Sequence, residues 1–188
     1  MMPRHIAWFN EASVEPSAEG NLISTDITMC QRCLAPAREL EKLGVDCSVF
    51  GNMHNADPAH VSKHLQKLNS DIVVIGKISG PSVVKLARAA KHLGCYVVAD
   101  FGHEKDINAD LIKLAEIADH IVAATPQTGA LILEKTGLAV IVIPDSDEKS
   151  SGKHAPDAIA HLWLESFKKL KLKPPLCANT NTPAATKH

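Results

Sequence analysis

The sequence has neither an excess of charge of one sign nor a long apolar run. Twenty Lys and Arg residues stand against 21 Asp and Glu residues in a chain of 188, which gives a formal net charge of -1. This balance offers no general electrostatic reason to expect DNA, RNA or an anionic membrane as a partner. No run approaches the roughly 18 apolar residues that span a bilayer, and the first ten residues lack the apolar stretch of a signal peptide. We therefore expect a cytoplasmic protein without a transmembrane segment.

The number and spacing of the cysteines also exclude some classes of protein. The five cysteines are an odd number and are scattered along the chain, which is not the pattern of a secreted disulfide framework. Cys30 and Cys33 form a C-x-x-C, but no second such pair accompanies it, so we interpret them as ordinary helix residues. His60 and His64 are spaced i, i+4 on a predicted surface helix, where solvated side chains are the expectation. We predict no metal site.

The two commonest phosphate-binding loops are absent. No G-x-G-x-x-G follows the first predicted strand, and no G-x-x-x-x-G-K-[ST] occurs anywhere. NAD enzymes and P-loop NTPases are therefore disfavoured, and we expect no cofactor.

What the chain does contain is a regular alternation of apolar runs and helical periodicity. Pro58, Pro81 and Pro126 mark helix starts, whereas Gly44, Gly94 and Gly137 mark helix ends. The alternation predicts an α/β fold with a doubly wound, parallel, six-stranded, Rossmann-like sheet, for which we prefer the strand order 3-2-1-4-5-6. The predicted strands are 6–10, 45–50, 72–75, 95–99, 120–124 and 139–143.

The composition and the pattern divide the chain into three parts. With 45% hydrophobic residues, one Rossmann-like domain over residues 1–146 can bury a sizeable core. Residues 147–170 read as a polar loop and an amphipathic helix that presents Ile159, Leu162, Trp163 and Phe167 to the domain or to a partner. Residues 171–188 read as a disordered tail.

Polar residues follow two neighbouring strands in the segment from Asp71 to Glu104. Lys77 comes after the third predicted strand, and Asp100, His103 and Glu104 come after the fourth. Because a strand, helix and parallel strand form a right-handed crossover, both strand ends open onto the same edge of the sheet. Two carboxylates and an imidazole could bind sugar hydroxyls or move a proton near neutral pH. The alternatives are a hydrogen-bonded cluster that fixes the loop and a solvated lysine.

A long loop follows the first strand at the same edge. It runs from Asn10 to Thr25 and contains one glycine, Gly20. Long loops at this edge often hold ligand contacts, so we include Asn10 and Gly20 among the candidate ligand-binding residues.

Several short motifs occur in an order that resembles a known family. Cys30-Gln31-Arg32-Cys33-Leu34-Ala35-Pro36-Ala37 gives a helix with an Arg and a Pro-Ala, Ile75-Gly76-Lys77 gives an apolar strand that exits into a Lys, and Val97-Val98-Ala99-Asp100 follows a Lys-x-x-Gly turn. With the later Thr125-Pro126 and Ile143-Pro144-Asp145, this order resembles the N-terminal, acceptor-side domain of GT-B glycosyltransferases of the group 1 (family 4) type.

The resemblance implies roles for particular residues and also a departure. It suggests His103 as an acceptor-side or catalytic histidine, with Asp100 and Glu104 as neighbours and Arg32 and Lys77 as further ligand contacts. A complete GT-B enzyme has a second Rossmann-like domain that holds most of the nucleotide-sugar, whereas about 43 residues remain here after Asp145. We therefore expect an acceptor-side half that is inactive without a donor-binding domain or partner.

Two alternatives belong to other classes. The first is a non-enzymatic binding module, in which the same edge recognises a small polar ligand or a protein. For the chain in general, the possible protein partners are a donor-binding subunit and further copies of the same chain. The second is a receiver-like or flavodoxin-like domain with strand order 2-1-3-4-5. A receiver needs an acidic cluster after strand one and an Asp after strand three, where this sequence has Asn10-Glu11 and Gly76-Lys77.

Overall fold

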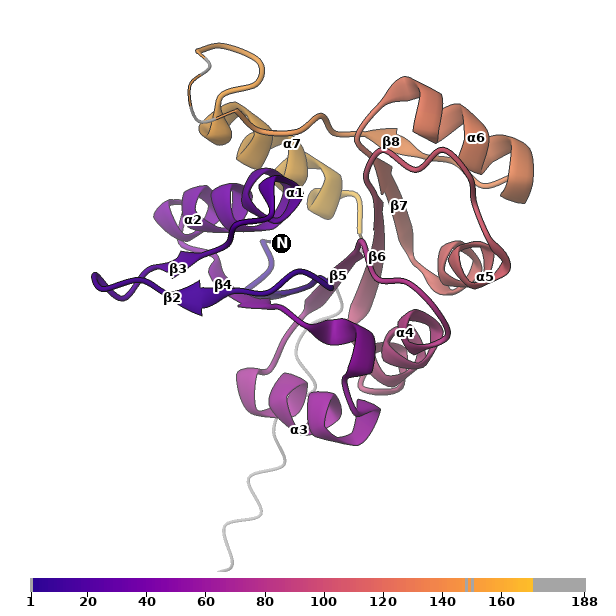
Figure 1. Cartoon of the computed structure of the whole chain (residues 1–188), viewed down its shortest axis with the longest axis horizontal. Coiled ribbons are helices and arrows are strands. Elements are labelled where there is room, and N and C mark those ends of the chain that lie inside the picture. Colours follow the sequence, from indigo (N-terminus) through magenta and orange to yellow (C-terminus); the bar gives the residue numbers. More distant parts are fainter. Residues whose placement is uncertain (1, 148, 150, 171–188) are drawn as a thin grey trace, which may run out of the picture.

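The computed structural model describes residues 2–147, 149 and 151–170. Its centre is a sheet of six parallel strands in the order β4-β1-β5-β6-β7-β8, with helices on both faces (Figure 1). The predicted α/β fold with a parallel six-stranded sheet is confirmed. The strands of this sheet are β1 His5–Phe9, β4 Asp46–Phe50, β5 Ile72–Gly76, β6 Tyr96–Phe101, β7 His120–Ala123 and β8 Ile141–Val142.

The preferred strand order is wrong. Counted along the chain, the six strands lie in the order 2-1-3-4-5-6, so the third strand β5 is next to β1 and the second strand β4 is at the edge. Burial gives the physical reason, because every residue of β5 is buried, whereas β4 begins with exposed Asp46 and is only partly buried beyond it. A continuously apolar strand belongs in the centre of a parallel sheet, and a mixed strand can lie at its edge.

This order is the one that flavodoxin-like folds share, but it does not by itself select a receiver. The residues at the ends of β1 and β5 are still Asn10-Glu11 and Lys77, and they lack the acidic cluster and the acceptor Asp.

Local sequence explains most helix boundaries. Asp57, Asn108 and Thr125 accept hydrogen bonds from the first turns of α3, α5 and α6, and Gly137 ends α6 in a left-handed conformation. The helices are α1 Ile27–Met29, α2 Ala35–Lys42, α3 Pro58–Leu68, α4 Ser82–His92, α5 Ala109–Ile117, α6 Pro126–Thr136 and α7 Pro156–Lys168, with a π-helical turn at Cys30–Leu34 and a 3-10 turn at Met53–Asn55. In the described part of the chain, no helix has both the length and the apolar character to span a membrane.

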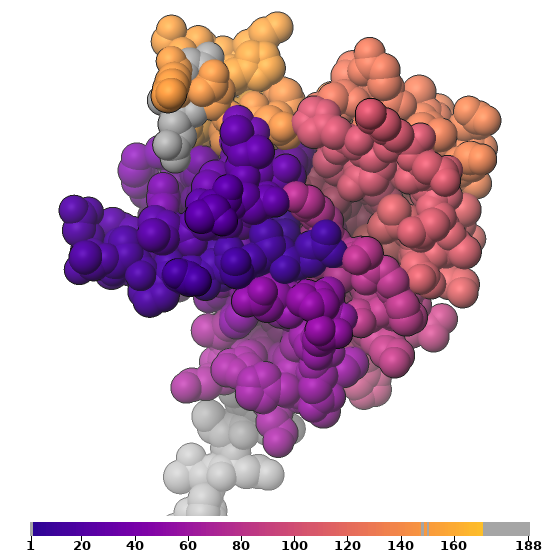
Figure 2. All heavy atoms as spheres, viewed as in Figure 1, coloured from indigo at the N-terminus to yellow at the C-terminus, as the bar shows by residue number. Residues whose placement is uncertain are grey.

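The alternation of side chains along β1 builds two cores, one on each face of the sheet. Ala7 and Phe9 point into the core beneath α3, α4, α5 and α6, whereas Ile6 and Trp8 point into the core beneath α2 and α7. A small separate hairpin, β2 Glu15–Pro16 with β3 Leu22–Ile23, follows β1 and projects from the body of the protein (Figures 1 and 2).

The last described helix packs on the domain, which was one of the two outcomes that its amphipathic pattern allowed. Trp163 of α7 is fully buried and meets Trp8 of β1 edge to face, with the ring centroids 5.0 Å apart. Ile159 and Phe167 are buried beside it, but Leu162 is 42% exposed. The prediction that Leu162 belongs to the buried apolar face of this helix is therefore wrong. The sequence after residue 170, including the predicted tail, lies outside the described residues.

Replacing Trp163 by Ala should destabilise the protein by ~3–5 kcal/mol, because it leaves a cavity against Trp8 that the sheet cannot close. Urea unfolding of the two proteins measures the difference. Leu162→Ala in the same helix is the matched control and should change the unfolding free energy by less than ~0.5 kcal/mol. Equal costs for the two substitutions would show that α7 does not complete this core.

Candidate functional site

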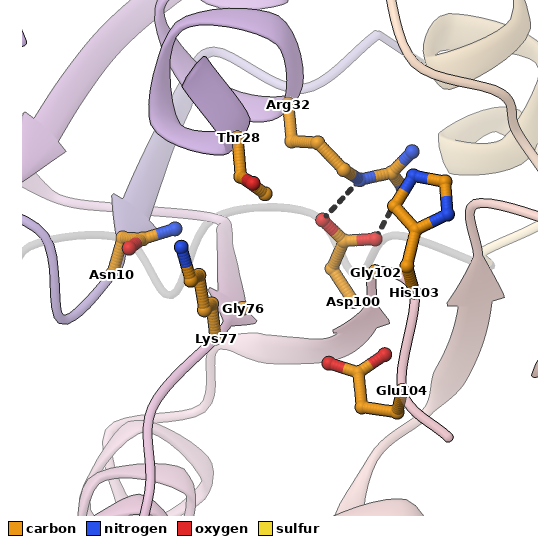
Figure 3. Close-up of a pocket in the computed structure, with 9 residues that line it drawn as sticks. All are labelled: Asn10, Thr28, Arg32, Gly76, Lys77, Asp100, Gly102, His103 and Glu104. Carbon is orange, nitrogen blue, oxygen red and sulfur yellow. Dashed lines mark hydrogen bonds and ion pairs between the residues drawn. The ribbon is translucent and has the colours of Figure 1, made fainter. Parts of the chain in front are cut away.

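A polar cavity of about 270 Å³ lies where β1, β5 and β6 end. After β1 the chain crosses to β4 on one side, and β5 and later strands lie on the other, so β1 and β5 flank the point at which the strand order reverses. Open α/β sheets bind ligands outside the carboxyl ends of the strands at this point. The lining residues are Asn10, Thr28, Arg32, Gly76, Lys77, Asp100, Gly102, His103 and Glu104 (Figure 3).

The helix that carries Arg32 is widened beside the cavity. Ala35 donates its backbone N–H to the carbonyl of Cys30, five residues earlier, which defines the π turn Cys30–Leu34. Pro36 follows, and proline has no N–H and collides with the carbonyl four residues before it, which here belongs to Arg32. The wider turn accommodates Pro36, and such bulges are frequent at functional sites.

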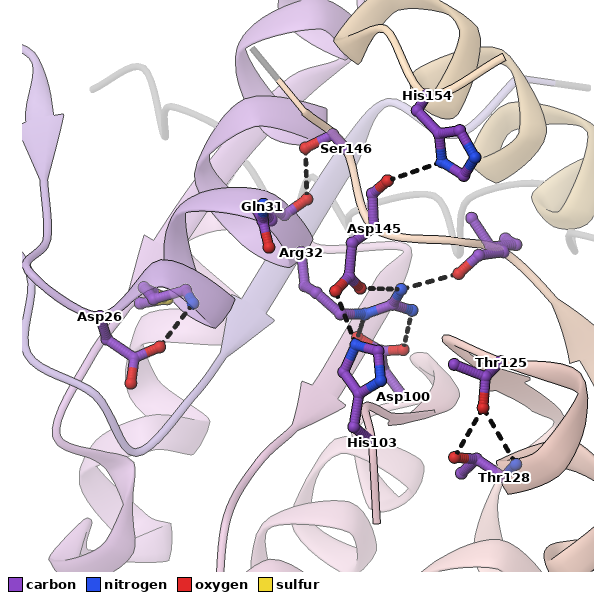
Figure 4. A network of polar contacts seen from close by, with 12 residues as sticks. Asp26, Gln31, Arg32, Asp100, His103, Thr125, Thr128, Asp145, Ser146 and His154 are labelled. Carbon is purple, nitrogen blue, oxygen red and sulfur yellow. Dashed lines mark hydrogen bonds and ion pairs between the residues drawn. The ribbon is translucent and has the colours of Figure 1, made fainter. Parts of the chain in front are cut away.

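The guanidinium of Arg32 is buried and donates four hydrogen bonds. Its Nε donates to Asp100 Oδ2 at 3.0 Å, and a second nitrogen forms an ion pair with Asp100 Oδ1. Nη1 donates to the carbonyl oxygen of Ile143 at 2.7 Å and to Asp145 Oδ1 at 3.0 Å, as Figure 4 shows. Although burial lowers the pKa of Arg32, the charges of Asp100 and Asp145 outweigh it and raise the pKa. Arg32 is therefore permanently charged and paired.

Gly76 lets Asp100 reach this position. A Cβ atom on Gly76 would lie 3.3 Å from both the backbone carbonyl oxygen and Oδ2 of Asp100, which is tighter than nine in ten real Cβ contacts. The absence of a side chain at the end of β5 therefore makes room for the carboxylate at the end of β6.

Asp145 joins the site from the end of the last strand and links Arg32 to His103. His103 Nε2 lies 2.8 Å from Asp145 Oδ2, and the His103 side chain is largely exposed. Burial raises the pKa of Asp145, but its hydrogen bond with His103 and the charge of Arg32 outweigh burial and lower that pKa. Sequence reasoning did not name Asp145 as a site residue, although Pro144-Asp145 directly follows a strand that opens onto the same edge.

Lys77 lies on the opposite side of the cavity from Arg32. Its φ of 46° is in the left-handed region, which is unfavourable for a residue with a side chain and is often found at functional sites. Lys77 Nζ lies 2.6 Å from Asp26 Oδ2, and Asp26 also caps α1 by accepting from the N–H of Met29. Burial raises the pKa of Asp26, but the hydrogen bonds from Lys77 and Met29 outweigh it and lower the pKa.

Glu104 carries an acceptor that has no partner. Among the described residues, its buried Oε2 atom accepts no hydrogen bond, and Figure 3 shows the carboxylate on the cavity side of the loop after β6. Burial is the main cause that raises the pKa of Glu104, and the nearby charge of Asp100 adds to it. Buried polar atoms are normally hydrogen-bonded, so this oxygen is an unsatisfied acceptor in the wall of the cavity.

Asn10 closes the floor of the cavity next to a cysteine. Its amide is buried, donates to Cys33 Sγ at 3.6 Å and accepts from the N–H of Ala12 at 3.0 Å. Burial and the charge of Asp100 raise the pKa of the Cys33 thiol to about 12. Reactive cysteines have lowered pKa values, so Cys33 is not suited to redox chemistry.

Six of the seven sequence-predicted site residues meet at this cavity: Asn10, Arg32, Lys77, Asp100, His103 and Glu104. Gly20 does not. It forms the tip of the β2–β3 hairpin with a φ of 82°, because that turn needs a left-handed residue. Thr28 was missed because no polar pattern distinguishes it, whereas Gly76 and Gly102 could have been found as glycines at strand ends.

Removing one partner of the buried Arg32 pair should be costly. Asp100→Asn leaves the guanidinium without its two-point carboxylate partner, so we expect a loss of ~3–5 kcal/mol of unfolding free energy in urea titrations. Asp145→Asn is the matched control, because Asp145 is more exposed and Arg32 keeps Asp100. It should cost clearly less, and a larger loss for Asp145→Asn would contradict the described pairing.

The raised pKa of Glu104 predicts a dependence of stability on pH. A carboxyl whose pKa is higher in the folded than in the unfolded state favours folding at low pH, and this contribution disappears as pH rises from about 4.3 through the folded-state value. Glu104→Gln cannot ionise and should gain stability relative to the wild type over that rise. Unfolding measured at several pH values tests this, with exposed Glu116→Gln as a control that should show no such gain.

Comparison with known proteins finds similarity of fold only. No family model matches the sequence, and no curated protein matches it. MurG of Acinetobacter baumannii is 13% identical with a TM-score of 0.49 over 78% of this chain and 47% of that chain, and HepE of Anabaena in complex with UDP is 14% identical with a TM-score of 0.47 over 76% and 44%. A designed Rossmann 2x3 protein is 10% identical with a TM-score of 0.41 over 91% and 95%. This chain thus spans less than half the length of MurG and of HepE.

Proposed function

We propose that this chain is the acceptor-side half of a GT-B-type glycosyltransferase, and that its cavity binds a sugar or another small polyhydroxylated ligand. The proposal rests on the hydrogen-bonding state of the groups that line the cavity. Its cationic side chains are already paired with carboxylates, whereas Glu104 Oε2 has no hydrogen-bond partner among the described residues. Arg32 is paired with Asp100 and Asp145, and Lys77 is paired with Asp26.

A nucleoside diphosphate needs cationic side chains or a run of backbone N–H groups that are free to meet its phosphates. Both cations that line this cavity already have carboxylate partners, and four carboxylates lie in or next to it. Hydroxyl groups, in contrast, donate hydrogen bonds to carboxylates, and Glu104 Oε2 offers an acceptor with no partner among the described residues. The chemistry of the cavity therefore favours a hydroxylated acceptor over a sugar nucleotide.

His103 is the group best placed to move a proton. His103 is exposed at the edge of the cavity, and its Nε2 is hydrogen-bonded to Asp145. In the tautomer with the proton on Nε2, the unprotonated Nδ1 can accept a proton from a ligand hydroxyl. Asp145 acts here as a positioning residue for the imidazole. Asp100 is occupied by Arg32, so we assign it a positioning role as well, and we assign Glu104 to hydroxyl binding.

Transfer itself requires a donor site, which we place on a second domain or a partner subunit. The non-enzymatic alternative uses the same cavity and the same ligand class, and it differs only in that the protein catalyses no reaction.

Ligand-observed NMR on the untagged chain tests the proposal. We expect saturation transfer to at least one of a panel of mono- and disaccharides, weakened at least tenfold by Glu104→Ala, and none to UDP or UDP-glucose. Glu19→Ala at the tip of the hairpin is the control and should leave binding unchanged. Tight binding of UDP, or sugar binding that Glu104→Ala leaves intact, would overturn the assignment.

A transfer assay separates the two candidates. If a donor-binding chain co-purifies with this one, His103→Ala should abolish transfer by the complex while the sugar still binds. A complex that binds the sugar but transfers nothing from any tested donor would favour the binding module.

A further inference from the structure

A second cavity, of about 390 Å³, lies between the end of β4 and helix α3. Its walls are mostly apolar and include Phe9, Phe50 and Met53, but two histidines of α3, His60 and His64, also line it. It shares no lining residue with the polar cavity at the ends of β1, β5 and β6. The proposed function therefore makes no use of this pair.

The two imidazole rings approach each other through their Nε2 atoms. His60 Nε2 and His64 Nε2 are 2.9 Å apart, and the ring centroids are 4.5 Å apart. Residues four apart in a helix lie on one face, which brings the rings together, and Phe50 contacts the His64 ring from the sheet side. The two Nε2 atoms thus face each other at the wall of the cavity.

That separation matches two ligands of one metal ion. Imidazole nitrogens bind Zn²⁺ at about 2.0–2.1 Å, so two of them at a right angle lie ~2.9 Å apart, whereas a tetrahedral angle gives ~3.3 Å. Right-angled nitrogen ligands are typical of Cu²⁺ and Ni²⁺, which also bind nitrogen sites more tightly than Fe²⁺ or Mn²⁺. Two histidines at i, i+4 on a helix are a recurrent way of holding a divalent metal.

The helix holds the pair rigidly. Asp57 caps α3 by accepting from the N–H of Ala59, and Pro58 occupies its first turn, so the backbone at His60 is fixed close to a stable helix start. A hydrogen bond between the two rings requires a proton on one Nε2, whereas in the tautomers with both protons on Nδ1 the two Nε2 atoms are free to bind a metal.

We propose that His60 and His64 chelate one divalent transition-metal ion of the Ni²⁺ or Cu²⁺ class at the mouth of the apolar cavity. Among the described residues, no group of three or more His, Cys, Asp or Glu side chains is arranged to hold a metal. The described residues thus supply two ligands, and in the proposed site water or a small donor molecule fills the remaining positions. A site of this kind is open and exchangeable rather than structural.

Isothermal titration of the untagged chain with NiCl₂ tests the proposal, since Ni²⁺ does not oxidise the free thiols. His60→Gln and His64→Gln should each weaken binding at this site at least tenfold. The second substitution should cost less than the first, because chelation is already lost with the first histidine. His92→Gln and His161→Gln, which change exposed histidines on other helices, should leave the affinity unchanged.

A swapped variant is the sharpest control. His64→Gln combined with Gln66→His keeps the composition of α3 but moves the second imidazole to a different face of the helix. We expect it to bind Ni²⁺ as weakly as His64→Gln, and we expect paramagnetic broadening of wild-type amide signals to centre on residues 60–64. Wild-type affinity in the swapped variant, or broadening centred elsewhere, would overturn the proposal.

Discussion

The burial of one charged group, the guanidinium of Arg32, is the constraint on which the site depends. A buried cation is stable only when carboxylates and carbonyls satisfy it, and here the partners come from positions 68 and 113 residues further along the chain. The same guanidinium lies over the ring of Trp163, 5.6 Å from its centroid. Arg32 thereby fixes the ends of β6 and β8 and helix α7 around one point.

Three departures from ordinary local structure lie around this point. The helix widens at Arg32, Lys77 adopts a left-handed backbone conformation, and a buried oxygen of Glu104 has no partner among the described residues. Each of these features costs stability where it stands, and such costs are typical of sites that are organised for a ligand. Among the helices on the far face of the sheet, α3, α5 and α6 each begin at a residue whose side chain caps the first turn.

The limits of sequence reasoning follow from the range of the interactions involved. Asp57, Asn108, Thr125 and Gly137 contact residues two to four positions away, so the boundaries they set were predictable. Convergence at the sheet edge was also predictable, because parallel strands carry their ends to one side. The strand order and the contact between Asp145 and His103 were not predicted from the sequence pattern, because they depend on which distant segments pack together. The mixed character of β4 was a visible signal of its edge position.

Helix α7 has a consequence for the order in which the protein can fold. It is the last described element to be synthesised, yet Trp163 and Phe167 are needed to cover Trp8 of the first strand. The core beneath α3 to α6 contains no residue beyond Ile132 among its buried members, so it can consolidate as soon as that part of the chain has been made. The opposite core, and with it the cover over Arg32, must wait for the carboxyl-terminal helix. A growing chain that has reached β8 thus exposes the indole of Trp8 to chaperones and to premature association.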